Sequence, residues 1–310
     1  MPTLSLDEFQ IGWICALPVE VAAAKEMLDE NFGILDEQDR NDTNSYILGR
    51  IGRHYVVIAG LGLYGLTSAT VVVIHMMRTF QSLRVGLMVG IAGGIPSPNH
   101  DIRLGDIVVS YPEGTCGGVI QYDLGKIVQG GKFVRSRALN GPPRVLLAAV
   151  ERMREALLTS SPTYPEYIQK ATQRTHRTKR TFARPDVSTD RLFRVEHEHP
   201  DSNTPTCEGC PIEWEEIRRP RENADVQIHY GIIASGNAVI KHGETRERIR
   251  QETGALCFEM EAAGLMMDFP CIIVRGICDY ADSHKNKGWQ GFAALTAASY
   301  MKELLGYVTF

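Results

Sequence analysis

Three acidic side chains whose spacing suits chemistry lie within residues 254–282. Glu259 and Glu261 flank a methionine in FEMEAAG, and Asp279 follows the apolar run at 271–278, which is rich in isoleucine and valine. A short run of this kind is typical of a buried strand. Because ligands of open α/β sheets bind at the carboxyl ends of strands, the sequence predicts an acidic site where this strand ends.

The two glutamates are expected at the start of a helix of small residues, where carboxylates are favoured. Residues that are two positions apart on a helix do not share a face. We therefore expect Glu259 to lie behind Glu261 and to contact it, rather than to contact a ligand. Asp279 has two alternatives: it could cap a helix, and Asp282 could be the acid in its stead.

A fourth carboxylate is expected at the same sheet edge. Residues 10–16 predict the first strand, and Pro18 begins a helix that the apolar spacing extends to Phe32, with Gly33 as its stop. Glu20 then lies at the turn between strand and helix.

Two glycine-rich segments follow. GLGLYG at 60–65 opens a helix to about Phe80; it has the spacing of a dinucleotide fingerprint but lacks the later acidic residue, so a tight helix–sheet approach is favoured. A strand at 84–90 leads into GIAGGI, where Gly90, Gly93 and Gly94 would let the backbone approach a ligand, with Ala92 and Gly93 as substrate-binding residues. A plain tight turn is the alternative.

The remaining elements alternate in the manner of an α/β domain. Strands are expected at 46–60, 104–110 and 227–236, and helices at 142–158, 244–254 and 289–305. No linker composition divides the chain, so residues 1–310 are predicted to form a single domain with an insertion at about 160–225.

The insertion carries a basic stretch and a group of possible metal ligands. Residues 169–184 have little hydrophobic periodicity and predict a solvated loop, or else a strand-lid region that meets an anionic ligand. Two histidines and two cysteines then have the number and types of a structural zinc site: His197, His199, Cys207 and Cys210. Free thiols or a redox pair are the alternatives. A metal here would stabilise a long loop and take no part in catalysis.

Composition excludes several classes of protein. The formal net charge of −4, with 44% hydrophobic and 23% charged residues, indicates a globular protein with no general attraction to nucleic acid or membrane. The N-terminus does not resemble a secretory leader. Several of the seven cysteines lie in apolar contexts that suit buried thiols, which predicts a reducing, cytoplasmic location.

Six segments together carry a resemblance to a known family. IGWICALPVE, VGIAGGI, LGDIVVS, GIIASGN, FEMEAAG and VRGICDYAD resemble the purine nucleoside phosphorylase and nucleosidase superfamily. Their order resembles the methylthioadenosine/S-adenosylhomocysteine nucleosidase branch, and most closely the nucleosidase domains of fungal NLR-like and ankyrin proteins. The resemblance implies a nucleoside phosphorylase-like, three-layer α/β/α sandwich around a mixed, largely parallel sheet, with no cofactor needed for catalysis.

The same resemblance implies roles for the acidic residues. Asp279 would protonate N7 of a departing purine, and Glu261 would hold the ribose hydroxyls while the sugar develops positive charge. Met260 would pack against the ribose. Glu20 would activate water, and Arg275 would help to position that water.

Water is expected as the nucleophile because the phosphate-binding arginines of phosphorylases are missing. Their places hold Met88 and Ile91 in the glycine block and Leu17 and Pro18 in the first turn. Losing bidentate clamps would weaken the binding of a phosphate dianion. The expected reaction is hydrolysis of the N-glycosidic bond, with a phosphate-dependent phosphorylase as the alternative.

The base is expected near Val239 and Ile240, with Phe258 available to stack on it. The substrate is an adenine nucleoside or nucleotide, and ATP is included because basic residues could bind a 5′-phosphate chain. These are the stretch at 170–184, Lys241 and Arg246.

Expected partners follow from the family as well. A homo-oligomer, most simply a dimer, is implied, and the chain could be fused to or signal to a downstream domain. A module that binds a nucleotide without turnover, as in NLR-like immune proteins, is a third hypothesis.

Overall fold

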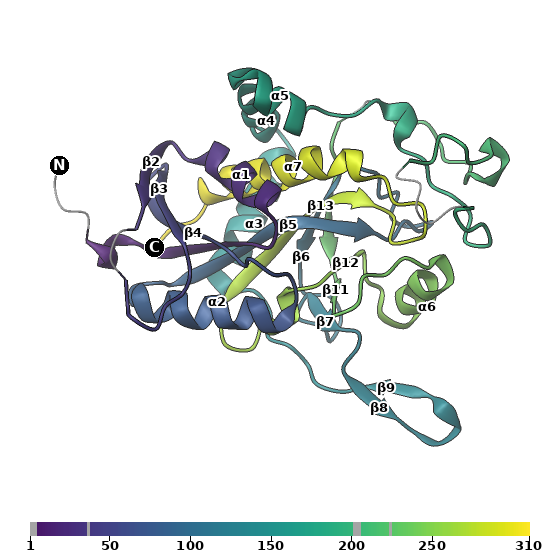
Figure 1. Cartoon of the computed structure of the whole chain (residues 1–310), viewed down its shortest axis with the longest axis horizontal. Helices are drawn as coiled ribbons and strands as arrows, with labels where there is room; N and C mark the ends of the chain where they lie inside the picture. The colour runs from purple at the N-terminus through teal and green to yellow at the C-terminus, as the bar shows by residue number, and fades with distance from the viewer. Residues whose placement is uncertain (1–4, 36–37, 201–205, 223–224) are drawn as a thin grey trace.

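The computed structural model describes residues 5–35, 38–200, 206–222 and 225–310. Its centre is an eleven-stranded sheet, with helices above and below it (Figure 1). Eight of the strands form a continuous path, in the order β10-β6-β13-β5-β1-β4-β3-β2. These are β10 (Ile228–Gly231), β6 (Ile107–Ser110), β13 (Cys271–Asp279), β5 (Val85–Gly94), β1 (Ile11–Cys15), β4 (His54–Gly60), β3 (Tyr46–Ile51) and β2 (Glu30–Ile34).

Three short strands extend the sheet beside β5, and a hairpin stands apart from it. The short strands are β7 (Val119–Gln121), β11 (Ile233–Ser235) and β12 (Cys257–Glu259), and the hairpin is β8 (Gly125–Ile127) with β9 (Phe133–Arg135). The central pairs β1–β4, β1–β5 and β13–β5 are parallel, whereas β13–β6 and β3–β4 are antiparallel. The predicted mixed, largely parallel sheet is therefore confirmed.

Helices cover both faces of the sheet. One buried cluster packs α1, α3 and α7 against it, and a second packs α2 on the other face. The helices are α1 (Pro18–Met27), α2 (Leu66–Thr79), α3 (Arg144–Leu157), α4 (Tyr164–Arg174), α5 (His176–Phe182), α6 (Gly243–Thr253) and α7 (Gln290–Leu305). Within the described ranges, none of the helices has the length and apolar character needed to span a bilayer.

The helix α7 approaches β13 closely because both contribute small residues. A β-carbon on Gly276 would collide with the backbone of Ala293, so only glycine fits at that strand position. Nearly all of α7 is buried. This contact fixes the strand that ends in Asp279 against the middle of the fold.

The first predicted helix ends earlier than its apolar spacing suggested. It ends at Met27, and residues expected to complete it form the edge strand β2, which pairs antiparallel with β3. Gly33 lies inside β2 with a φ of 94° at a shift of register, rather than at a helix end. Pairing with β3 outweighs the weak local preference for helix.

The glycine segment at 90–94 is also different from its prediction. It is no turn but the continuation of β5, because β13 runs parallel beside it as far as the pair of Asp279 with Gly93. The predicted strand at 227–236 is divided into β10 and β11, which pair with different neighbours.

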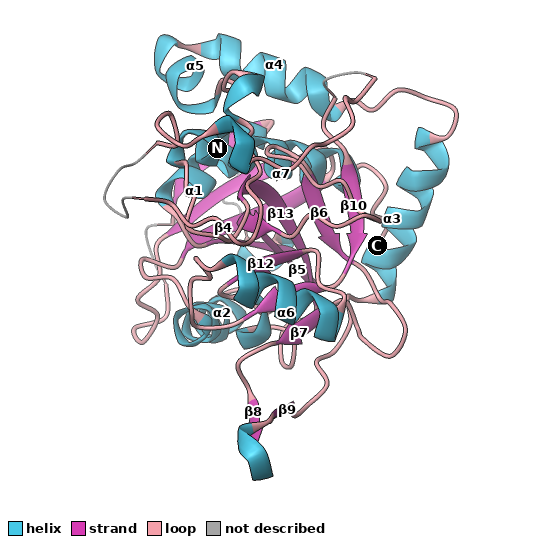
Figure 2. Cartoon of the chain, turned by 90° about the vertical axis from the view of Figure 1, so that its right-hand side faces the viewer, coloured by secondary structure: helices cyan, strands magenta, loops and turns pink. Residues whose placement is uncertain are grey.

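The basic stretch at 169–184 is neither a solvated loop nor a lid. It forms most of α4 and α5, which lie above α7 (Figure 2). The α4 helix buries Tyr164 and Ala171, and its start is capped by another helix: Glu303 of α7 accepts hydrogen bonds from the backbone N–H groups of Thr163 and Tyr164, at 3.0 and 2.7 Å. Because the cap comes from a residue about 140 positions away, local sequence patterns do not reveal it.

Candidate active site

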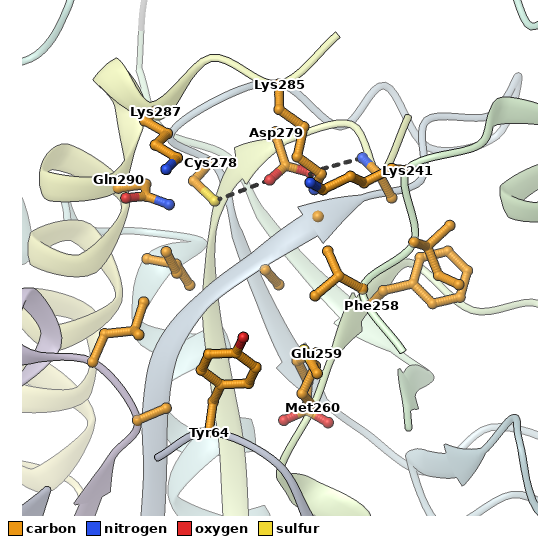
Figure 3. Close-up of a pocket in the computed structure, with 18 of the residues that line it drawn as sticks. Tyr64, Lys241, Phe258, Glu259, Met260, Cys278, Asp279, Lys285, Lys287 and Gln290 are labelled. Carbon is orange, nitrogen blue, oxygen red and sulfur yellow. Dashed lines mark hydrogen bonds and ion pairs between the residues drawn. The ribbon is translucent and has the colours of Figure 1, made fainter. Parts of the chain in front are cut away.

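A cavity of about 570 Å³ opens at the carboxyl ends of β5 and β13 (Figure 3). It brings together ten of the eleven residues that the sequence proposed for catalysis and substrate binding. These are Glu20, Ala92, Gly93, Val239, Ile240, Phe258, Glu259, Met260, Glu261 and Asp279. The eleventh, Arg275, lies beneath the cavity and does not line it.

Glu20 is held by the backbone around it. It is the third residue of α1, which begins at Pro18, and its carboxylate accepts hydrogen bonds from the N–H groups of Ala16, Leu17 and Ile91 at 2.7–2.9 Å. Burial raises the pKa of Glu20, and the nearby charge of Arg275 together with these hydrogen bonds opposes that rise. The carboxylate therefore has a fixed position and stronger basicity than an exposed glutamate.

Gly90 makes room for this arrangement. A β-carbon at that position would collide with the carboxylate of Glu20 and the guanidinium of Arg275. The glycine thus serves the close approach of two side chains, whereas the sequence had suggested an approach to the ligand.

Arg275 is a fully buried cation between two carboxylates. It projects from β13, and its guanidinium forms ion pairs with Glu259 and, at 3.2 Å, with Glu261. The sequence had predicted that Glu259 lies at the start of a helix, and this was wrong. Glu259 is the last residue of the strand β12, and only a short 3₁₀ turn, Ala262–Gly264, follows Glu261. Arg275 therefore contacts these two carboxylates and does not line the cavity.

Glu261 is a buried carboxylate whose pKa lies near neutral pH. It is 4% exposed, and it accepts hydrogen bonds from the backbone N–H groups of Gly65 at 3.2 Å and Met260 at 3.3 Å. Burial is the largest influence and raises its pKa to about 7, although Arg275 opposes the rise. Gly65 has a φ of 114°, which favours glycine, and its N–H contacts Glu261 in this conformation. This accounts for a glycine directly before α2.

Asp279 lies at the end of β13, as predicted. One carboxylate oxygen accepts hydrogen bonds from the backbone N–H of Ala281 and from the ammonium group of Lys285, both at 2.8 Å. The alternative acid, Asp282, does not line the cavity; it is bound by Arg246 at 3.1 Å instead.

Apolar groups from two loops and a strand form the remaining wall. Phe258 packs edge to face against Tyr122, with ring centroids 5.5 Å apart. Val239, at 49% exposure, and Ile240 lie at the same cavity. An aromatic ring held in place beside open space can receive a flat heterocycle.

Three lysines line the cavity, and the sequence had indicated only Lys241. Lys285 and Lys287 lie in the loop between β13 and α7, where they accompany Asn286 and Gln290. Figure 3 shows Lys287 and Gln290 close to Cys278, and Lys285 beside Asp279. A signal was available: both lysines follow Asp279 by fewer than ten positions, so a loop that turns back on the strand end brings them to it.

The other basic residues proposed for a phosphate chain lie elsewhere. None of residues 169–184 lines the cavity. Arg246 is buried and donates to the carbonyl of Tyr280 at 2.7 Å as well as to Asp282.

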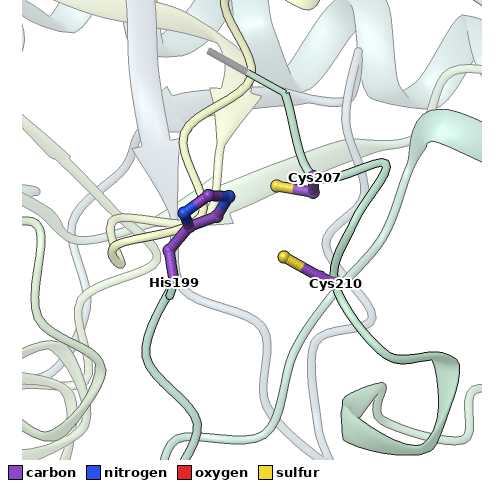
Figure 4. Close-up of side chains that lie close together, drawn as sticks. All are labelled: His199, Cys207 and Cys210. Atoms are coloured by element: carbon purple, nitrogen blue, oxygen red, sulfur yellow. The ribbon is translucent and has the colours of Figure 1, made fainter. Parts of the chain in front are cut away.

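Three of the four proposed zinc ligands lie together in the insertion (Figure 4). The ligand atoms of His199, Cys207 and Cys210 are all within 4.8 Å of one another. His197 does not join them, because its ring stacks on Trp214 with centroids 4.8 Å apart. All seven cysteines have free thiols, and six of them are buried.

The family model described as the phosphorylase superfamily matches residues 10–305. The chain belongs to the phosphorylase superfamily. A nucleotide-binding leucine-rich repeat (NLR)-like protein of Hyaloscypha variabilis is 47% identical over 98% of the chain, which spans only 30% of that protein. The ATP nucleosidase Cap17 of Escherichia coli is 26% identical over 92% of the chain, which spans about half (48%) of that protein.

A relative that the chain covers almost completely and a solved structure are also similar to it. The 5′-methylthioadenosine/S-adenosylhomocysteine nucleosidase of Mycobacterium tuberculosis is 23% identical, with 95% of each protein covered. The crystal structure of the corresponding Helicobacter pylori nucleosidase matches with a TM-score of 0.61 at 16% identity, covering 96% of this chain and 98% of that one. The phosphorylase-superfamily fold expected from the sequence is confirmed.

Proposed function

We propose that this member of the phosphorylase superfamily hydrolyses the N-glycosidic bond of adenine nucleotides, ATP among them, and releases free adenine. The observation that carries the proposal is a single cavity in which Glu20 and Glu261 meet Asp279 and three lysines. The nucleosidases among its relatives, including an ATP nucleosidase, support the same reaction class.

The departing base needs a proton. As the bond between C1′ of the ribose and N9 of the purine breaks, its electron pair goes to the purine, and a proton on N7 neutralises the developing charge. Asp279 is the acid we assign to that step, with Phe258 beside the base.

The sugar becomes positively charged while the bond breaks. Glu261 lies on the other side of the cavity, where it can accept hydrogen bonds from the ribose hydroxyls and stabilise this cation. Glu20 takes a proton from water as the water oxygen bonds to C1′, so the products are free adenine and the ribose phosphate.

Water is favoured over phosphate as the nucleophile by the charge of the site. A phosphate dianion at C1′ would lie against the carboxylates of Glu20 and Glu261, which repel it. Among the described residues that line the cavity, the cations are Lys241, Lys285 and Lys287, and Figure 3 shows Lys285 beside Asp279.

The lysines support a nucleotide rather than a nucleoside. A phosphate chain on the 5′ carbon carries several negative charges, and lysine is a common partner for phosphate. With the base at Phe258 and Asp279, we assign the phosphate chain to the side of Lys287 and Gln290.

The test is chromatography of products from a substrate panel containing ATP, AMP, adenosine and 5′-methylthioadenosine, with and without inorganic phosphate. Adenine release from ATP without phosphate is the expected result, and an Asp279→Asn variant should lower it by about 10²–10⁴-fold. A requirement for phosphate would identify a phosphorylase, and binding of ATP without any product would identify a sensor.

The nucleotide assignment has its own variant. Lys287→Ala should raise KM for ATP by about tenfold and leave the KM for adenosine unchanged, because adenosine has no phosphate to lose contact with. Lys170→Ala, in the basic stretch away from the cavity, is the matched control. Equal effects on both substrates would contradict the assignment.

The expected homo-oligomer and the fusion to a further domain stay predictions. So does the cytoplasmic location.

A further inference from the structure

The insertion contains a group of metal-ligand atoms that the proposed reaction does not use. The thiols of Cys207 and Cys210 and a ring nitrogen of His199 lie within 4.8 Å of one another. In a tetrahedral zinc site the bonds are about 2.0–2.3 Å long, which places ligand atoms roughly 3.3–3.8 Å apart. The observed group therefore needs to contract by about 1 Å to bind the ion.

A second histidine, which is buried, lies next to this group but outside the insertion. His284, in the loop after β13, has its ring centroid 5.4 Å from that of His199, and its side chain is only 1% exposed. Neither of its ring nitrogens has a hydrogen-bond partner among the described residues. Its Nδ1 is 3.9 Å from a carboxylate oxygen of Asp282, which is beyond hydrogen-bond distance.

A buried imidazole without a partner is costly unless something binds it. An unsatisfied buried polar group destabilises a fold by about 1–3 kcal/mol. A metal ion beside His284 would remove that cost. The sequence had named His197 as the fourth ligand, but its ring is engaged in stacking on Trp214.

We propose that Cys207, Cys210, His199 and His284 bind one zinc ion. Two thiolates and two imidazoles fill all four tetrahedral positions, so the ion has no open position for water and its role is structural. Each thiol releases a proton when it binds the metal, and the two thiolates balance the charge of Zn²⁺.

Neighbouring side chains orient the two cysteines and His284. The guanidinium of Arg191 donates to the carbonyl oxygens of Cys207 and, at 2.8 Å, Cys210, and this holds the turn that presents the two thiols. On the other side, the ring of Phe193 stacks on that of His284 with centroids 3.9 Å apart and fixes its plane. Such outer contacts orient the ligands of metal sites.

The ion would tie the insertion to the loop that serves the cavity. His284 is adjacent to Lys285, whose ammonium group contacts Asp279. The same two segments also meet where the backbone N–H of His199 donates to the hydroxyl of Ser283 at 2.9 Å. Zinc would therefore hold the loop with Lys285 in its place against the cavity.

The experiment measures the metal content of the untagged chain, purified under reducing conditions from zinc-supplemented cells. We expect one zinc per chain, and replacement by Co²⁺ should give the visible bands of a tetrahedral Cys₂His₂ site. His284→Ala and Cys207→Ser should each lower the affinity for zinc by more than about 100-fold, which exceeds the effect of losing an outer contact. His197→Ala, the matched control, should keep the zinc and the Co²⁺ spectrum.

Two results would overturn the proposal. If the reduced wild-type chain binds no zinc, or if a Cys207–Cys210 disulfide is found in the protein as isolated, the cysteines are free thiols or a redox pair. If His284→Ala keeps the Co²⁺ spectrum of the wild type, His284 is not a ligand. Circular dichroism of each variant distinguishes loss of metal from loss of fold.

Discussion

The cavity and the basic stretch at 169–184 hold their charged side chains in different ways. Around the cavity, Glu20 receives three backbone N–H groups and Arg275 is fully buried between two carboxylates. In the basic stretch, the side chain of Arg174 is 61% exposed and reaches over to Glu26 of α1, whose own side chain is 8% exposed. The contrast teaches that charge density does not identify the site. Burial against the core does, because only there are the positions of charged groups fixed.

The largest effect is expected from Glu20. Glu20→Gln keeps one oxygen that can accept from the N–H groups of Ala16 and Leu17, but it loses the acceptor for Ile91 and removes the base, so adenine release should fall by about 10²–10⁴-fold. The rate is measured under saturating ATP, with the melting temperature as a control for folding. If the rate stays within threefold of wild type, another group activates the water.

Arg275 tests the buried side of the comparison through stability. Arg275→Met leaves Glu259 and Glu261 buried without their cation and should lower the free energy of unfolding by about 3–5 kcal/mol, measured in urea. Arg275→Lys retains the charge and should lose less. If Arg275→Met were as stable as wild type, the ion pairs would contribute nothing to the fold.

The pKa of Glu261 predicts a dependence on pH. It is raised from 4.5 to about 7, so between these values the folded state binds more protons than the unfolded state. The free energy of unfolding should therefore fall as pH rises through this window, on the order of 2 kcal/mol. Since the ionised form stabilises the ribose cation, adenine release should increase as pH rises through about 7.

Glu261→Gln is the matched variant for this dependence. It should reduce the fall of stability between pH 4.5 and 7 and leave the share that Glu20 contributes in the same direction. Unchanged pH curves in this variant would assign the titration to another residue.

The smallest effect is expected in the insertion. Arg174→Ala removes an ion pair in which the arginine is 61% exposed, and it should change stability by less than about 1 kcal/mol. Adenine release should equal that of wild type. A tenfold loss of activity would show that the basic stretch serves the substrate after all, and would erase the contrast between the two regions.

The sequence predicted the residues that depend on local pattern. The strand before Asp279 has a continuous apolar run, and the turn before Glu20 combines a strand with a proline at a helix start. Both signals act over a few residues, and both elements formed as predicted. The cysteine pair was recognised for the same reason.

The sequence did not predict the elements and side-chain positions that depend on residues far away in the chain. The helix at Tyr164 forms because Glu303 caps it, and β2 forms because β3 is beside it. Lys285 and Lys287 belong to a segment without periodicity, and only the return of this segment to the strand end brings them to the cavity.

By itself, the sequence determined which acids stand at the ends of its elements, because propensity and apolar spacing act between near neighbours. Tertiary structure decided which of them meet. Ile91 is 71 positions from the Glu20 that it binds, and Arg275 is 14 from Glu261 and on a different strand from Glu259. Such pairs depend on the order of strands in the sheet, which brings distant segments together only when the whole chain packs.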